Sequence, residues 1–225
     1  LGPTSYGDSP YQTFSAFANN PYFIDLDFLV SEKLLRKSEI EATSTSPRYV
    51  DYKELYEERF IVLKKAFHRF NLKNEAYLHF VEENKKWLND YALFMAIKVK
   101  HGGDSWLKWE DDIRLRVPSV ITEYENLLKE DVDFYKFLQF KSYEQWFALK
   151  KYANDKGIMF IGDMPIYVSY DSSDVWANSN YFDLNENKLP IHIAGVPPDN
   201  YSSDGQLWGN PLYNWDYLEK NEFEW

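Results

Sequence analysis

The sequence from residue 157 to residue 168 reads Gly157-Ile-Met-Phe-Ile-Gly-Asp-Met-Pro-Ile-Tyr-Val168, and this stretch indicates the fold most directly. Residues 158–161 form a short apolar run between two glycines, which is typical of a strand covered on both faces of a parallel sheet. Asp163 would then lie at the C-terminal end of this strand. Because the functional groups of a (β/α) barrel gather at those strand ends, Asp163 is a candidate functional residue. The alternative is that Asp163 caps a turn before Pro165.

The next informative stretch reads Ala194-Gly-Val-Pro-Pro-Asp-Asn-Tyr-Ser-Ser-Asp-Gly-Gln-Leu-Trp-Gly-Asn-Pro-Leu-Tyr213. It is rich in aromatic and hydrogen-bonding side chains, and flat aromatic rings are suitable partners for the apolar faces of sugars. Residues 191–211 approach the length at which a structureless loop in a compact domain is usually functional. We therefore expect a lid loop over a sugar-binding site.

The placement of glycine and proline divides the chain into three parts. Between residues 48 and 156 these residue types occur only as Gly102, Gly103 and Pro118, and apolar residues recur at steps of three and four, as in residues 51–70. This spacing predicts amphipathic helices that pack into a core. The pattern as a whole predicts an α/β fold, part of a (β/α)8 TIM-type barrel with a large helical insertion. The expected parts are a barrel-derived first strand loop and helix over 1–35, a helical insertion over 36–156, and a barrel strand with a substrate-binding lid loop over 157–225.

Composition excludes several classes of function. The chain has 25 basic and 36 acidic residues, a net charge of −11, which argues against nucleic acid or an anionic membrane as a partner. It has no cysteine, which fits a cytoplasmic protein, and no apolar run long enough to span a membrane. The four histidines are scattered without metal-ligand spacing, so neither a metal nor a cofactor is predicted. Nucleotide-binding glycine loops and the serine hydrolase elbow are also missing from the sequence.

The segment Asp171-Ser-Ser-Asp-Val-Trp176 contains two further acids. Asp171 and Asp174 could form a catalytic pair. The interpretation we favour is that both lie at a helix N-terminus, where carboxylate and hydroxyl oxygens accept hydrogen bonds from free backbone N–H groups.

Three motifs resemble those of the 4-alpha-glucanotransferase, or amylomaltase, family. They are Ser9-Pro-Tyr-Gln12, Gly162-Asp-Met-Pro-Ile-Tyr-Val168, and the run from Gly195 to Pro211, and they occur in the family's order. Family-like stretches also occur in the helical middle, so the resemblance covers essentially the whole chain. It implies an enzyme that transfers α-1,4-glucan segments between maltooligosaccharides by a retaining mechanism with a covalent glycosyl-enzyme.

The resemblance also implies the residues that bind substrate. Ser9 and Tyr11 would line the wall near the cleaved linkage, and Asp163 would bond to sugar hydroxyls. Gln206 and Trp208 would contact donor or acceptor rings. The alternative for each is a residue that packs a loop. The full expected set is Tyr6, Ser9, Tyr11, Asp163, Asp199, Tyr201, Gln206, Trp208 and Asn210.

No catalytic residue is predicted within these 225 residues. The family's nucleophile lies in an Arg-Ile-Asp-His-type motif, and neither Arg-Ile-Asp nor His-Asp occurs in this sequence. We therefore expect a piece of such an enzyme, cut at both ends, whose nucleophile and acid/base lie beyond Trp225 and whose partner is the remainder of the same chain. Two alternatives stay open: a fragment of an amylase-type α-glucan hydrolase, and a non-catalytic glucan-binding or helical interaction module.

Overall fold

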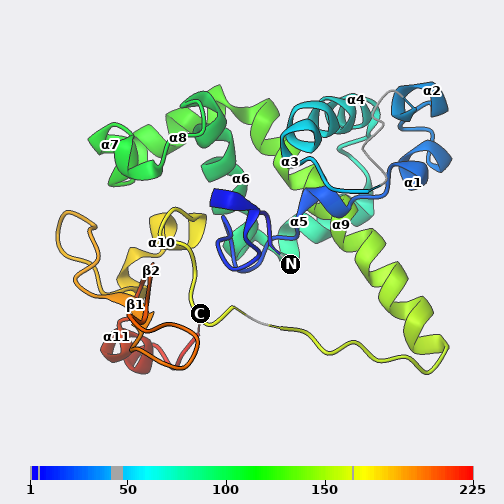
Figure 1. Ribbon diagram of the computed structural model, residues 1–225. Coiled ribbons are helices and arrows are strands. Elements are labelled where there is room, and N and C mark those ends of the chain that lie inside the picture. Colours follow the sequence, from blue (N-terminus) through cyan, green and yellow to red (C-terminus); the bar gives the residue numbers. More distant parts are fainter. Residues whose placement is uncertain (1, 5, 42–47, 164, 225) are drawn as a thin grey trace.

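The computed structural model describes residues 2–4, 6–41, 48–163 and 165–224, apart from the side chain of Tyr6 (Figure 1). Helices dominate the described residues, and two strands form an antiparallel sheet. The elements are η1 (Tyr6–Asp8), η2 (Pro21–Phe23), α1 (Leu26–Ser31), α2 (Lys37–Ile40), α3 (Tyr52–Glu54), η3 (Leu55–Arg59), α4 (Phe60–Arg69), α5 (Glu75–Glu83), α6 (Lys85–Lys100), η4 (Trp106–Lys108), α7 (Asp111–Arg114), α8 (Pro118–Leu127), α9 (Lys129–Asp155), α10 (Ser173–Ala177), η5 (Ser179–Tyr181), β1 (Ile193–Val196), β2 (Gln206–Pro211) and α11 (Trp215–Lys220).

The core is built around α9, the longest helix among the described residues. Its N-terminal half packs against α4, α5 and α6 through aromatic side chains, and Phe67 of α4 lies 5.5 Å from Phe134 and 5.7 Å from Phe137 between ring centroids. Tyr91 of α6 meets Tyr135 edge to face. Such pairs add to the stabilisation that comes from burying their area. The expected use of the apolar helix faces as core is confirmed.

The expected helix boundaries in the middle of the chain are largely confirmed. The periodic stretch 51–70 forms α3, a π-helical turn (η3) and α4 in succession. Gly102 lies just after α6 with φ +65°, a backbone region that glycine adopts without strain. Pro118 occupies the first position of α8, where its missing N–H leaves no helical hydrogen bond unmade.

The expected buried strand at residues 158–161 is wrong for this structure. The segment pairs with no strand in the described ranges, and its side chains are exposed, up to 100% for Ile161. Figure 1 shows it leaving the C-terminal end of α9 and crossing alone toward α10 and the hairpin. A parallel strand needs neighbouring strands and covering helices, and none of the described residues lies beside this segment in those roles.

The expected lid loop at residues 191–211 is also corrected, because most of it is a β-hairpin. β1 pairs antiparallel with β2 through Gly195 opposite Leu207 and Val196 opposite Gln206. A Cβ atom on Gly195 would lie 2.4 Å from the carbonyl oxygen of Gln206, so glycine permits the close approach of the two strands. The two consecutive prolines and the polar loop interrupt the alternation of apolar and polar residues by which strands are predicted from sequence.

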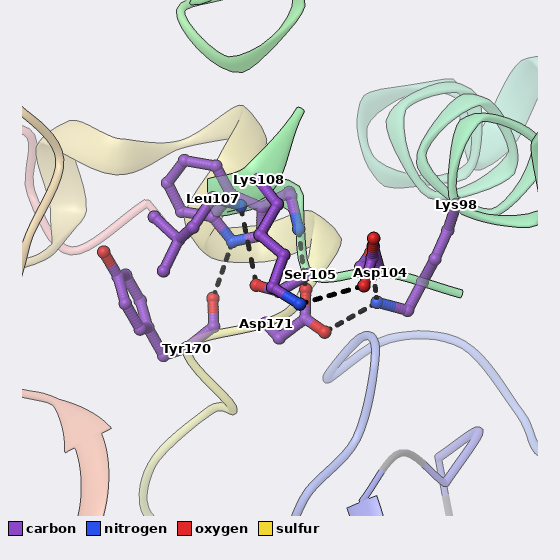
Figure 2. A network of polar contacts seen from close by, with 8 residues as sticks. Lys98, Asp104, Ser105, Leu107, Lys108, Tyr170 and Asp171 are labelled. Carbon is purple, nitrogen blue, oxygen red and sulfur yellow. Dashed lines mark hydrogen bonds and ion pairs between the residues drawn. The ribbon is translucent and has the colours of Figure 1, made fainter. Parts of the chain in front are cut away.

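The acids before α10 have different roles. Ser172, not Asp171, caps the helix, and its side chain accepts the N–H of Val175. Asp171 instead accepts from Lys98 Nζ at 2.6 Å and from the backbone N–H of Trp106 at 3.2 Å, as the dashed lines in Figure 2 show. The interpretation of Asp171 as a helix cap is therefore wrong. Asp174 does lie in the first turn of α10, but its carboxylate binds a distant part of the chain.

One core cluster draws residues from all three expected parts of the chain. It joins Leu29 and Leu35 of the first part to α4, α6 and α9, and it continues to Trp176 and Phe182 of the third part. The structure thus combines helices with a small sheet. The division at residues 35 and 156 stays a prediction.

Candidate functional site

A pocket of about 570 Å³ lies where three distant segments of the chain meet. One wall comes from the segment before η2, the second from the stretch that follows the exposed apolar residues 158–161, and the third from β2. The pocket brings together five of the nine expected site residues with four that were not expected. The lining residues are Ser9, Tyr11, Gln12, Asp163, Pro165, Ile166, Tyr167, Trp208 and Asn210.

The polar side of the pocket is organised around Asp163. The hydroxyl of Tyr11 donates to Oδ2 of Asp163 at 3.3 Å, across 152 residues of sequence. Tyr11 is itself set by a turn in which its N–H donates to Ser9 Oγ at 3.3 Å. Both Tyr11 and Asp163 are exposed. An exposed carboxylate next to a phenolic hydroxyl can accept hydrogen bonds from the hydroxyl groups of a neutral ligand.

The apolar side of the pocket is aromatic. Trp208 projects from β2 and is 41% exposed, with its ring centroid 6.4 Å from that of Tyr167. Its indole N–H donates to Gln206 Oε1 at 3.0 Å, and Tyr167 is stacked in turn on Tyr213. The open face of Trp208 is therefore oriented by its neighbours before a ligand arrives, and such a face can stack on a sugar ring.

Asn210 ties the three walls together. It is 5% exposed, its Nδ2 donates to the carbonyl oxygen of Val168 at 2.8 Å, and its Oδ1 accepts from Gln12 Nε2 at 3.2 Å. One amide group thus links β2 to the other two walls. This geometry makes Asn210 a positioning residue in the free structure, and its expected contact with substrate stays a prediction.

Three expected residues lie outside the lining of the pocket. Asp199 organises the hairpin loop, because its Oδ1 accepts the N–H groups of Tyr201 and Ser202, each at 2.8 Å. Tyr201 is 96% exposed on the same loop. Gln206 acts through Trp208, as described above. The side chain of Tyr6, the ninth expected residue, lies outside the described part of the structure.

The residues that sequence reasoning missed belong to the same motifs as those it found. Gln12 follows Tyr11 in the first motif, while Pro165, Ile166 and Tyr167 follow Asp163 in the second. The motifs gave a usable signal, since every lining residue belongs to one of them. Which of their side chains turn toward the pocket depends on how distant segments meet.

Metal and membrane sites receive no support from the described residues. Among them no group of three or more histidine and acidic side chains could hold a metal ion. None of the helices in the described ranges combines the length and apolar character needed to span a membrane.

The chain belongs to the 4-alpha-glucanotransferase family, whose model matches residues 1–225. A 4-alpha-glucanotransferase of Clostridium butyricum is 52% identical over 229 residues, which are 100% of this chain and 47% of that protein. The 4-alpha-glucanotransferase of Thermus thermophilus is 47% identical over 228 residues, 99% of this chain and 45% of that protein. The chain thus spans about half the length of these curated relatives.

A solved structure agrees with this assignment. The amylomaltase from Streptococcus agalactiae in complex with acarbose superposes with a TM-score of 0.94 at 45% sequence identity. The match covers 100% of this chain and 46% of that one.

Proposed function

We propose that this chain forms part of the substrate cleft of an enzyme that transfers α-1,4-glucan segments between maltooligosaccharides. The observation that carries the proposal is the pocket in which Tyr11, Asp163 and Trp208 meet from three family motifs. It is supported by the relatives named as 4-alpha-glucanotransferases and by the similar amylomaltase that was solved with acarbose. A carboxylate can accept hydrogen bonds from sugar hydroxyls, and an aromatic face can stack on a sugar ring.

The proposed chemistry needs groups beyond those of this pocket. In retaining transfer, one carboxylate attacks the anomeric carbon while a carboxyl group protonates the departing glycosidic oxygen, and a glycosyl-enzyme forms. An acceptor hydroxyl then displaces the enzyme carboxylate and gives its proton to the second residue. Among the described lining residues, Asp163 carries the one carboxyl group. We therefore assign binding and orientation to this chain, and the reacting carboxylates to the remainder of a longer enzyme.

We propose in addition that residues 158–161 become a barrel strand in that longer enzyme. Ile158, Met159, Phe160 and Ile161 are all exposed in this structure. Burial of four such side chains between a sheet and its helices is strongly favourable. Neighbouring strands would also form ladder hydrogen bonds with the backbone of this segment. The (β/α)8 barrel and its helical insertion stay proposals, as does a cytoplasmic location.

A hydrolase that cleaves the same glucans is the second candidate, since the two reactions differ only in whether a sugar or water resolves the intermediate. The position of Trp208 among the pocket-lining residues supports transfer, because an acceptor sugar stacked on its ring would exclude water. A non-catalytic glucan-binding module would have the same pocket but would release no products from a glucan.

Product analysis with maltotriose tests the proposal. We expect the purified 225-residue chain to form no glucose or longer maltodextrins, and a longer enzyme that contains it to form both. In that enzyme, Trp208→Ala should lower the ratio of transfer to hydrolysis several-fold, about the effect of losing one aromatic contact. Trp215→Ala, which removes an exposed indole outside the pocket, is the matched control.

Two results would contradict the proposal. Transfer products formed by the 225-residue chain alone would show that the reacting groups are within it. An unchanged ratio in Trp208→Ala would remove the argument that Trp208 favours an acceptor sugar over water.

A further inference from the structure

The pocket wall at residues 9–12 lies outside any helix or strand. Its local structure is a turn in which the N–H of Gln12 donates to the carbonyl oxygen of Ser9 at 3.2 Å. A segment with so little regular structure opens easily unless other parts of the chain hold it. Gln12 holds the end of this segment through its bond to Asn210. The position of Tyr11 opposite Asp163 therefore depends on that bond and on how the residues that follow are anchored.

Two consecutive residues of α10 bind the chain directly after the wall. The backbone N–H and the hydroxyl of Ser173 both donate to the carbonyl oxygen of Phe14, at 2.9 and 3.0 Å. Oδ2 of Asp174 accepts the N–H of Ala16 at 2.8 Å. These bonds fix the chain at positions 14 and 16, two to four residues beyond the wall.

The helix that supplies these bonds is itself set in the core. Trp176 is buried, and its indole N–H donates to the carbonyl oxygen of Ile113 at 3.2 Å. The guanidinium of Arg116 lies over the Trp176 ring, 4.2 Å from its centroid. α10 is therefore anchored in the core, and the bonds from Ser173 and Asp174 restrict the motion of the chain that follows the wall.

The burial of Asp174 is unusual for a carboxyl group. The residue is 4% exposed, and the described residues offer it no ion pair. Burial raises the pKa of Asp174 to about 7, against the lowering effect of the backbone N–H groups of Ala16 and Asp174, and the carboxylate of Asp90 adds to the rise. An unpaired buried carboxylate is destabilising unless hydrogen bonds compensate it. When ionised, it offers the N–H of Ala16 a stronger bond than a neutral acceptor does.

We propose that Asp174, assisted by Ser173, is a positioning residue that holds segment 9–12 as one wall of the pocket. Its effect on a glucan is indirect, through the placement of Tyr11 against Asp163, and this part rests on the proposed function. Asp174 itself is not among the residues that line the pocket.

Amide hydrogen exchange and calorimetric binding of maltoheptaose, both on the full 225-residue chain, test this role. In Asp174→Ala, we expect exchange at residues 11–16 to be at least about tenfold faster while amides of α6 keep their protection. The dissociation constant of maltoheptaose should rise about fivefold, the effect of one lost hydrogen bond. Asp174→Asn keeps an acceptor oxygen and should stay within about twofold of the parent in both measurements.

Two further variants separate this role from general loss of structure. Ser173→Ala removes one of the two bonds to Phe14 and should speed exchange at residues 11–16 by a smaller factor than Asp174→Ala. If Asp174→Ala does not fold, Ser173→Ala still provides the test. Asp155→Asn, which changes an exposed carboxylate paired with Lys151 on α9, should change neither measurement.

The proposal is overturned if exchange at residues 11–16 is unchanged in Asp174→Ala, or in Ser173→Ala where Asp174→Ala does not fold. It is also overturned if the parent binds maltoheptaose and the variant, despite faster exchange at residues 11–16, binds it with the same affinity. A parent that does not bind maltoheptaose would count against the proposed function instead, and the exchange rates would then decide alone whether Asp174 holds the wall.

Discussion

Single residues in the pocket are already paired before any ligand is present. The hydroxyl of Tyr11 donates to Asp163, and the indole of Trp208 donates to Gln206. Such bonds restrict the rotamers of side chains that are otherwise exposed, which lowers the entropy lost on binding. Tyr11, Asp163 and Trp208 line the pocket, so a bound sugar hydroxyl could replace one of these bonds.

The carboxyl group of Asp174 gives a prediction for the pH dependence of stability. Burial raises its pKa from 3.8 to about 7, so the folded chain holds a proton that the unfolded chain releases above pH 3.8. Its contribution to stability is therefore fully present below pH 3.8 and is lost as pH rises through about 7. We expect the free energy of unfolding, relative to Asp174→Asn, to fall by at most about 1.4 kcal/mol per pH unit in this window.

Urea denaturation at a series of pH values from 4 to 8 measures this difference. Two neighbours of Asp174 must be considered, Asp90, which raises its pKa, and Tyr213, whose own pKa is raised to about 12 by burial. Tyr213 does not titrate in the window. A difference between parent and Asp174→Asn that does not change with pH would contradict the prediction.

At the scale of elements, the hairpin depends on a close approach that only glycine allows. Because a Cβ atom on Gly195 would lie 2.4 Å from the carbonyl oxygen of Gln206, Gly195→Ala should force the strands apart. We expect a loss of about 1–3 kcal/mol, the usual effect of overpacking. Hydrogen exchange of the β1 and β2 amides, together with thermal unfolding, measures it.

Gly162→Ala is the matched control for this prediction. A Cβ atom at Gly162 meets nothing within 4 Å, so the substitution should change stability by less than about 0.5 kcal/mol. If both alanine variants behaved alike, the close packing of β1 against β2 would not be what stabilises the hairpin.

The extended segment at residues 158–161 gives a second prediction at this scale. It exposes an apolar edge, and such edges pair with other chains. We expect the double variant Met159→Lys and Ile161→Lys to reduce self-association in sedimentation velocity experiments. Ile61→Lys changes an exposed isoleucine of the helix α4 and should leave self-association as it is. Equal association of the parent and the double variant would contradict this role of the segment.

The sequence was informative about elements that depend on local pattern and less so about those that depend on distant partners. The helix over 51–70 follows from spacing along one chain segment, and it is observed. The strand expected at 158–161 requires neighbouring strands, which the described residues do not supply. Likewise the hairpin pairs β1 with β2 across a loop whose two prolines suggest irregular structure.

The same distinction applies to the pocket. Ser9, Tyr11, Asp163, Trp208 and Asn210 line it, in agreement with the motifs to which they belong. The internal bonds of Asn210 and the burial of Asp174 could not be predicted, because both depend on contacts between segments more than 40 residues apart.

At the scale of the whole molecule, the pocket exists only when the core is assembled. Its described lining residues come from three segments, 9–12, 163 with 165–167, and 208–210, and the main core cluster includes residues of α6 and α9. Any change that loosens this core should therefore open the pocket before it unfolds the helices. The net charge of −11 suits a cleft for neutral rather than anionic ligands.

The central claim is that Tyr11, Asp163 and Trp208 form one surface that binds linked glucose units. Calorimetric titration of maltoheptaose into the 225-residue chain tests it most directly, with Asp163→Asn and Trp208→Ala as variants and Trp215→Ala as control. We predict measurable binding by the parent and control, weakened about fivefold in each pocket variant. No binding by the parent, or the same affinity in all four proteins, would contradict the account.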